Sequence, residues 1–133
     1  MNKVSDREPL LRVNEISYSY EAEKRALNCV NVTIYPGEKI ALTGSNGAGK
    51  STFLLCLNGV LKPDSGSVYY KNQLIGKKEL NELRKKVGFV FQDADSQIVA
   101  STVFSEISFG PANLKLSPPE IKKRVEMALS YMK

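Results

Sequence analysis

The sequence predicts a layered α/β domain, because strand-like and helix-like segments alternate along its 133 residues. Two short apolar runs, 39–43 and 87–91, are each typical of a strand that is covered on both faces, and the first of them leads directly into a glycine-rich loop. Other strand-like stretches alternate apolar and polar residues, as in an antiparallel sheet with one exposed face. Helical segments lie between and after these strands, which is the pattern of an α/β fold.

The antiparallel strands come first along the chain. Residues 10–20 are strand-like, although the alternation slips by one residue at Glu15-Ile16, where we expect a bulge. Apolar residues alternate with polar ones over 30–34 and predict a half-exposed strand that ends at the Pro36-Gly37 turn. A third strand is expected at 67–70, between two turn-forming clusters.

Four helices are expected. The first spans 50–58 and stops at Asn58-Gly59, and a short charged helix covers 79–86. A third runs from Thr102 to Phe109 and ends at Gly110-Pro111. The last begins at residues 117–120 with a capping box and a proline at its first position. Its apolar face consists of Ile121, Val125, Ala128, Leu129 and Met132.

The net charge of +5 is unevenly distributed. Basic residues concentrate in 71–86 and 115–133, whereas 87–114 holds no Lys or Arg. A nucleic-acid stripe is one interpretation, but aromatic residues are not interleaved with these charges, so solvated helix faces are favoured. No apolar run approaches the ~20 residues that cross a bilayer, and two cysteines form no disulfide framework, so a reducing cytosol is the default compartment.

Between the first buried strand and the first helix lies a sequence that fits the phosphate-binding pattern G-x-x-x-x-G-K-[ST]. Its glycines let the backbone direct successive N–H groups at phosphate oxygens, and the helix N-terminus adds partial positive charge. Lys50 is expected to bridge the β- and γ-phosphates, the Ser51 hydroxyl to bind Mg²⁺, and Thr52 to reach the α-phosphate. The predicted phosphate-binding residues are Gly44, Ser45, Asn46, Gly47, Ala48, Gly49, Lys50, Ser51 and Thr52.

The segments around this loop resemble the nucleotide-binding domain of ABC transporters. Tyr20 matches the aromatic residue that stacks on adenine in that family, and 61–68 looks like the turn and strand that follow the phosphate-loop helix. Residues 87–91 look like the strand that leads into the Q-loop, with Gln92 as its glutamine. Gln97 and the ending Phe109-Gly110-Pro111 are similar to energy-coupling-factor and cobalt-type (CbiO-like) transport ATPases.

The resemblance implies a P-loop NTPase fold of the ABC type, with an antiparallel β subdomain, a partial parallel core sheet and helices. It implies that ATP and Mg²⁺ bind here, with Tyr20 on the adenine, and with Lys50 and Gln92 as catalytic residues. Gln92 would coordinate Mg²⁺ or orient the attacking water. The implied protein is the energy-coupling subunit of a membrane importer, peripheral on the cytoplasmic face of the membrane. Its expected partners are integral membrane subunits and a second ABC ATPase subunit.

Several family elements are not found in this sequence. No four-residue apolar run leads into Asp-Glu as a Walker B strand would, no LSGGQ-type signature occurs, and the chain has no histidine. We therefore expect residues 1–133 to be the N-terminal part of an ABC-type ATP-binding domain. Such a chain is expected to bind ATP without efficient hydrolysis, because phosphoryl transfer also requires groups that position water and stabilise charge.

Two other classes remain open from the sequence. A soluble ABC-type ATPase acting on nucleic acid or the ribosome would use the basic segments. A different P-loop enzyme, such as a GTPase, would need an N-K-x-D base-reading segment, which is not found here. Asp93 and Asp95 are interpreted as solvated loop carboxylates and not as a metal site. Cobalt, nickel and a vitamin are all compatible as the transported substrate.

Overall fold

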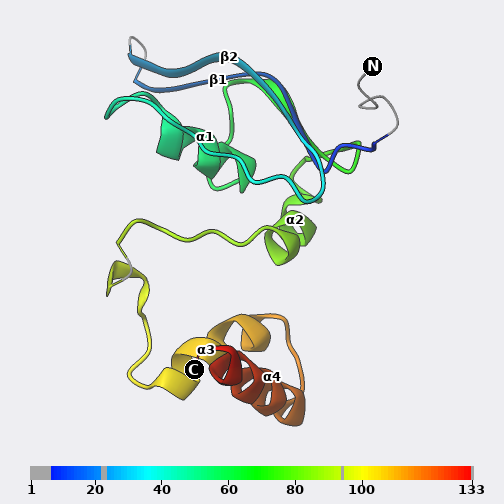
Figure 1. Cartoon of the computed structure of the whole chain (residues 1–133), viewed down its shortest axis with the longest axis vertical. Coiled ribbons are helices and arrows are strands. Elements are labelled where there is room, and N and C mark those ends of the chain that lie inside the picture. Colours follow the sequence, from blue (N-terminus) through cyan, green and yellow to red (C-terminus); the bar gives the residue numbers. More distant parts are fainter. Residues whose placement is uncertain (1–6, 22–23, 94, 133) are drawn as a thin grey trace. The chain divides into compact units, whose positions relative to one another are not determined.

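The computed structural model describes residues 7–21, 24–93 and 95–132. Ala94, within the segment that resembles the cobalt-type ATPases, lies outside them. The chain forms two compact units, Met1–Phe89 and Val90–Lys133 (Figure 1). Each unit is described in turn.

The first unit is built on an antiparallel sheet. Its strands are β1 (Leu11–Glu21), β2 (Lys24–Ile34), β3 (Ser65–Tyr70) and β4 (Gln73–Leu74), in the order β2-β1-β3-β4. Val13 in β1 lies opposite Val32 in β2 and Val68 in β3, so one apolar row crosses three strands. The three strands expected at 10–20, 30–34 and 67–70 are therefore confirmed, although β2 begins earlier than predicted, at Lys24.

The expected bulge in β1 is also confirmed. The pairing of β1 with β2 shifts between Val13 and Ile16, and Glu15 adopts a positive φ of 49°. The Glu15 N–H leaves the ladder and donates to the Asn31 Oδ1 atom at 2.9 Å. As a result Ile16 returns to the core side, where it is fully buried.

Helix α1 (Lys50–Leu57) lies beside this sheet and completes the core (Figure 1). Its Asn58 C-cap agrees with the predicted stop. A shorter helix, α2 (Leu80–Lys86), follows β4 and buries Leu83. Burial raises the pKa of the Cys56 thiol to about 11, and the negative charge of Asp64 adds a smaller contribution. The core cluster consists of Val13, Ile16, Leu27, Phe53, Cys56, Leu57 and Val68.

The two buried strands expected at 39–43 and 87–91 are not formed, so this prediction is wrong for the structure as described. Ile40 and Leu42 are about half exposed, and Val90 is 89% exposed. A strand covered on both faces needs neighbouring strands and helices that supply hydrogen bonds and apolar contacts. Within the described residues all four strands belong to the antiparallel sheet, so no parallel core sheet forms there. An α/β arrangement of sheet and helices is nevertheless confirmed.

The second unit contains a short 3₁₀ turn, η1 (Asp95–Gln97), and the helices α3 (Val103–Asn113) and α4 (Pro118–Tyr131). Helix α3 continues through Gly110-Pro111, so its predicted end is wrong. A proline near the end of a helix removes only its own N–H bond. The Leu114 N–H still donates to the Gly110 carbonyl at 3.2 Å and completes the last turn.

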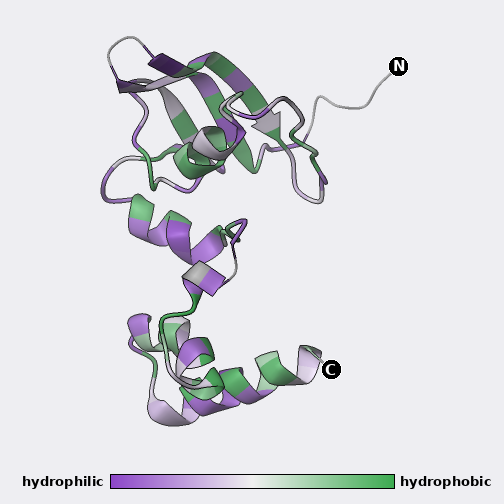
Figure 2. Ribbon diagram, turned by 90° about the vertical axis from the view of Figure 1, so that its left-hand side faces the viewer, coloured by the Kyte–Doolittle hydropathy of each residue, from purple (hydrophilic) through white to green (hydrophobic). Residues whose placement is uncertain are grey.

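Helix α4 begins with Pro118 at its first position, as expected, but the predicted capping box is not formed. Ser117 makes no side-chain capping bond, and the Glu120 carboxylate accepts a hydrogen bond from the Arg124 guanidinium at 2.9 Å instead. Val125 is buried, and hydrophobic residues follow one side of the helix (Figure 2). In the part of the chain that the structure describes, no helix is long and apolar enough to span a membrane.

Candidate nucleotide-binding site

The phosphate loop bends where three glycines adopt positive φ values. Gly44, Gly47 and Gly49 have φ of 149°, 81° and 86°, a region that side chains with a Cβ rarely occupy. The Ala48 N–H donates to the Ser45 carbonyl at 3.2 Å and closes a turn inside the loop. The chain then enters α1 at Lys50.

Gly49 is required by space as well as by conformation. A Cβ at this position would lie 2.3 Å from the Ala26 carbonyl oxygen and 3.2 Å from the Leu27 Cδ2 atom, both in β2. The end of the loop therefore packs directly on a sheet strand. The Phe53 N–H donates to the Gly49 carbonyl at 2.8 Å, so the same residue also begins the helix.

Lys50 lies over its own loop. Its Nζ atom donates to the carbonyl oxygens of Gly44 and Ser45 at 2.8 and 2.7 Å, which holds the ammonium group beside the loop backbone. The first turn of α1 has no acidic side chain, and Gly49 supplies no side-chain cap. The positive end of the helix and a lysine therefore face the same loop, which favours an anion. Ser51 is exposed at this helix start.

Tyr20, near the end of β1, lies close to the helix that follows the loop. Its hydroxyl oxygen is 3.1 Å from the Thr52 Oγ1 atom, although 32 residues separate the two. The Tyr18 ring meets the Tyr20 ring in a T-shaped contact with centroids 5.1 Å apart. Tyr20 is still 58% exposed, so much of its ring is open to solvent. The structure thus brings two of the predicted site residues together.

Asp64 holds the strand that carries Tyr20, a role that the sequence interpretation missed. Its carboxylate accepts a hydrogen bond from the Ser19 N–H at 2.8 Å, and its own N–H donates to the Ser17 carbonyl at 2.9 Å. The sequence indicated only a turn at 62–66. An aspartate in a turn cluster is itself a signal, because its side chain commonly bonds to nearby backbone.

Gln92 lies in the second unit, where it is exposed. The neighbouring loop is closed by Gln97, whose Nε2 atom donates to the Asp93 carbonyl at 3.0 Å. The sequence marks Gln97 as a distinctive position but does not predict this bond. Its amide ties Gln97 to the backbone of Asp93, the residue next to Gln92.

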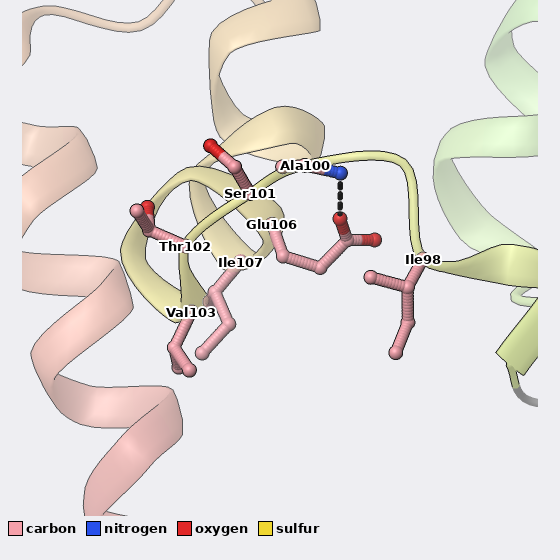
Figure 3. A pocket seen from close by; sticks show the side chains of 7 residues that line it. All are labelled: Ile98, Ala100, Ser101, Thr102, Val103, Glu106 and Ile107. Atoms are coloured by element: carbon pink, nitrogen blue, oxygen red, sulfur yellow. Dashed lines mark hydrogen bonds between the residues drawn. The ribbon is translucent and has the colours of Figure 1, made fainter.

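A hollow of about 280 Å³ lies at the start of α3 (Figure 3). The Glu106 carboxylate accepts hydrogen bonds from the backbone N–H groups of Val99 and Ala100 at 3.0 and 2.7 Å, the second of which Figure 3 draws. These bonds hold the segment before the helix against the helix itself. The hollow is lined by Ile98, Ala100, Ser101, Thr102, Val103, Glu106 and Ile107.

A family model described as ABC transporter matches residues 27–133, which include the whole phosphate loop. The chain belongs to the ABC transporter family. Two curated relatives sharpen the assignment. An energy-coupling factor transporter ATP-binding protein, EcfA2, from Methanospirillum hungatei is 47% identical over 92% of this chain and 31% of its own length. A cobalt import ATP-binding protein, CbiO, from Rhodobacter capsulatus is 45% identical over 93% of this chain and 45% of its own length.

Solved ABC structures agree with this assignment. CbiO1 from Clostridium perfringens, described as part of the ABC transporter complex CbiONQ, superposes with a TM-score of 0.78 at 42% identity, over 92% of this chain and 50% of that one. A second structure is an ATP-binding cassette in a dimeric post-hydrolysis state, bound to ADP and Pi. It superposes with a TM-score of 0.75 at 29% identity, over 90% of this chain and 56% of that one. The P-loop NTPase fold and the resemblance to energy-coupling-factor and cobalt-type subunits are confirmed. The chain spans less than half the length of these two curated relatives.

Proposed function

We propose that this chain binds Mg-ATP as part of the energy-coupling ATPase subunit of an ABC importer of the energy-coupling-factor or cobalt type. The phosphate loop carries the proposal. Gly49 packs on the Ala26 carbonyl, and Lys50 is held beside the loop by two carbonyl groups. Such a loop at a helix N-terminus is suited to a chain of phosphates.

The base and the metal ion also have candidate partners near this loop. Tyr20 offers an exposed aromatic ring for adenine, and the Tyr20–Thr52 contact keeps that ring beside α1. The exposed Ser51 hydroxyl is a hard oxygen ligand of the type that Mg²⁺ prefers. Mg²⁺ would supply charge neutralisation of the phosphates there. Gln92 is proposed as a further ligand or as the residue that orients the attacking water.

In the intact subunit, hydrolysis would drive transport across the membrane. The proposed partners are integral membrane subunits and a second ATPase subunit, and the proposed location is peripheral, on the cytoplasmic face. Names of relatives support this, since they include an energy-coupling factor transporter protein and a cobalt import protein.

The alternative of a soluble ABC protein acting on nucleic acid is not favoured. Part of its supposed basic stripe is engaged within the protein, since Arg84 donates to the Gly59 carbonyl at 2.8 Å. Lys85 forms an ion pair with Glu82. These contacts fit the solvated helix face that the sequence favoured.

The direct test is calorimetric titration of the chain with Mg-ATP, comparing the unmodified protein with Lys50→Ala. Loss of charged hydrogen bonds to phosphate should weaken binding by about 10- to 150-fold. Lys78→Ala removes an exposed lysine elsewhere in the same unit and should bind as the unmodified chain does. Equal affinities for Lys50→Ala and Lys78→Ala would contradict the proposal.

A further inference from the structure

The contact between Tyr20 and Thr52 joins two ends of the proposed nucleotide site. Tyr20 lies near the end of β1, the strand proposed to hold the base, and Thr52 lies in the first turn of α1, the helix proposed to hold the phosphates. Their oxygens are 3.1 Å apart, within hydrogen-bonding distance. No stacking interaction requires this bond, because an aromatic ring stacks through its face.

The hydrogen-bonding capacity of the two groups allows a chain of bonds. A phenol and a threonine hydroxyl each carry one donor and can also accept. If Tyr20 donates to the Thr52 Oγ1 atom, the Thr52 hydroxyl proton remains available for a third group. A hydroxyl that accepts one bond also becomes a stronger donor of the next.

The surroundings hold both residues in place for this role. Thr52 is only 6% exposed, so little water competes with Tyr20 for its hydroxyl. The strand before Tyr20 is fixed by the bonds of Asp64 to Ser17 and Ser19, and the Tyr18 ring contacts the Tyr20 ring edge to face. The phenol is therefore presented to Thr52 by ordered neighbours.

We propose that Tyr20 is also a positioning residue for phosphate binding: its hydroxyl donates to Thr52 and directs the Thr52 hydroxyl toward the α-phosphate. This inference rests on the proposed function, because it requires that phosphates bind at the loop. Its consequence is specific. Removing the Tyr20 hydroxyl weakens the binding of a ligand that has no base at all.

The test uses calorimetric titration with Mg-tripolyphosphate, which carries phosphates but no base, and with Mg-ATP. Tyr20→Phe keeps the ring and removes one oxygen, and Thr52→Val removes the hydroxyl at similar volume. Each should weaken Mg-tripolyphosphate binding by about 2- to 10-fold, the range of one net hydrogen bond. The double variant should lose no more than the larger single loss, because both changes break the same chain of bonds.

Two further variants separate positioning from a general disturbance. Thr52→Ser keeps the hydroxyl and should restore the affinity, and Tyr131→Phe removes an equivalent oxygen from a tyrosine that is 78% exposed in α4 and should change nothing. The positioning role of Tyr20 would be overturned if Tyr20→Phe bound tripolyphosphate as the unmodified chain does, or if the two losses multiplied in the double variant. Either result would leave the proposed function intact. An unmodified chain that binds neither ligand would overturn the proposed function itself.

Discussion

The two units of the chain cover their apolar side chains to very different extents. Of the ten buried hydrophobic residues among those described, nine lie in Met1–Phe89 and only Val125 lies in Val90–Lys133. Several large apolar residues of the second unit are instead more than half exposed. They include Ile98, Val99, Val103, Phe104 and Phe109.

This difference shows two ways of holding the segment that precedes a helix. The phosphate loop is packed on a core, because Gly49 contacts β2 and α1 buries Phe53 in the same cluster. The segment before α3 is held by polar caps, with Thr102 accepting from the Ser105 N–H and Glu106 accepting from two backbone N–H groups. Phosphate binding at the loop should therefore depend on the core of the first unit and be insensitive to the apolar packing of α3 and α4 in the second.

The largest effect is expected from Gly49→Ala, paired with Gly47→Ala as its control. Both glycines have φ above 80°, but a Cβ at position 49 would meet the Ala26 carbonyl whereas nothing lies within 4 Å of one at position 47. Gly47→Ala should cost only the backbone strain, about 1–2 kcal/mol. Gly49→Ala adds a clash with backbone and should lower the free energy of unfolding by about 3 kcal/mol or more.

The measurement is urea unfolding followed by tyrosine fluorescence, with Mg-ATP titration of each variant. Gly49→Ala should also lose most of its Mg-ATP affinity, since the loop can no longer seat on β2. Equal stability of the two alanine variants would show that the loop does not depend on its contact with the first unit's core.

A matched pair of valines tests the comparison between the two units through an effect of intermediate size. Val13 in β1 and Val125 in α4 are each 1% exposed. Changing either to alanine should cost about 1–3 kcal/mol locally, from lost apolar contact and the remaining cavity. Val13→Ala should lower the hydrogen-exchange protection of β1–β3, whereas Val125→Ala should lower that of α3 and α4 and leave Mg-ATP affinity unchanged.

The outcome that would break the comparison is a Val125→Ala variant that loses protection in β1 or binds Mg-ATP less tightly. The two units would then unfold as one cooperative body, and the stability of α3 would depend on the core of the first unit.

Features set by neighbouring residues were predictable from the sequence. The alternation of β2, the bulge at Glu15, and the start and stop of α1 all follow from local spacing and glycine chemistry. The phosphate loop belongs to this group, because eight consecutive residues define it. Its conformation, with Gly47 and Gly49 at positive φ, follows from the same residues.

Features that need distant partners were not predictable in the same way. The strands expected at 39–43 and 87–91 had the right composition, but a buried strand forms only beside others. The capping box failed because Arg124, one turn further along α4, competes for the Glu120 carboxylate. The Tyr20–Thr52 and Ser19–Asp64 bonds join residues 32 and 45 apart, a separation that no local pattern encodes.

The smallest effect is expected from two surface ion pairs, one in each unit. Glu82 in α2 pairs with Lys85, and Glu120 in α4 pairs with Arg124, each glutamate lying in the first turn of its helix. A hydrogen bond from the partner is the first cause that lowers the pKa of each carboxyl below its ordinary value near 4.5. Their stabilisation is therefore present above that value and is lost as the pH falls through the lowered pKa.

Both glutamates are exposed enough that solvent screens them, so Glu82→Gln and Glu120→Gln should change global unfolding little. Hydrogen exchange of α2 and α4 near neutral pH should nevertheless distinguish the effects of the two substitutions. Among the described residues each helix buries one side chain, Leu83 in α2 and Val125 in α4, but α2 is also tied to the rest of the first unit by the hydrogen bond from Arg84 to the Gly59 carbonyl at 2.8 Å. Glu120→Gln should therefore lower protection in α4 more than Glu82→Gln does in α2, and the gap should close in acid, where both wild-type carboxyls are neutral. A larger loss of protection in α2 would mean that its contacts within the first unit do not stabilise it.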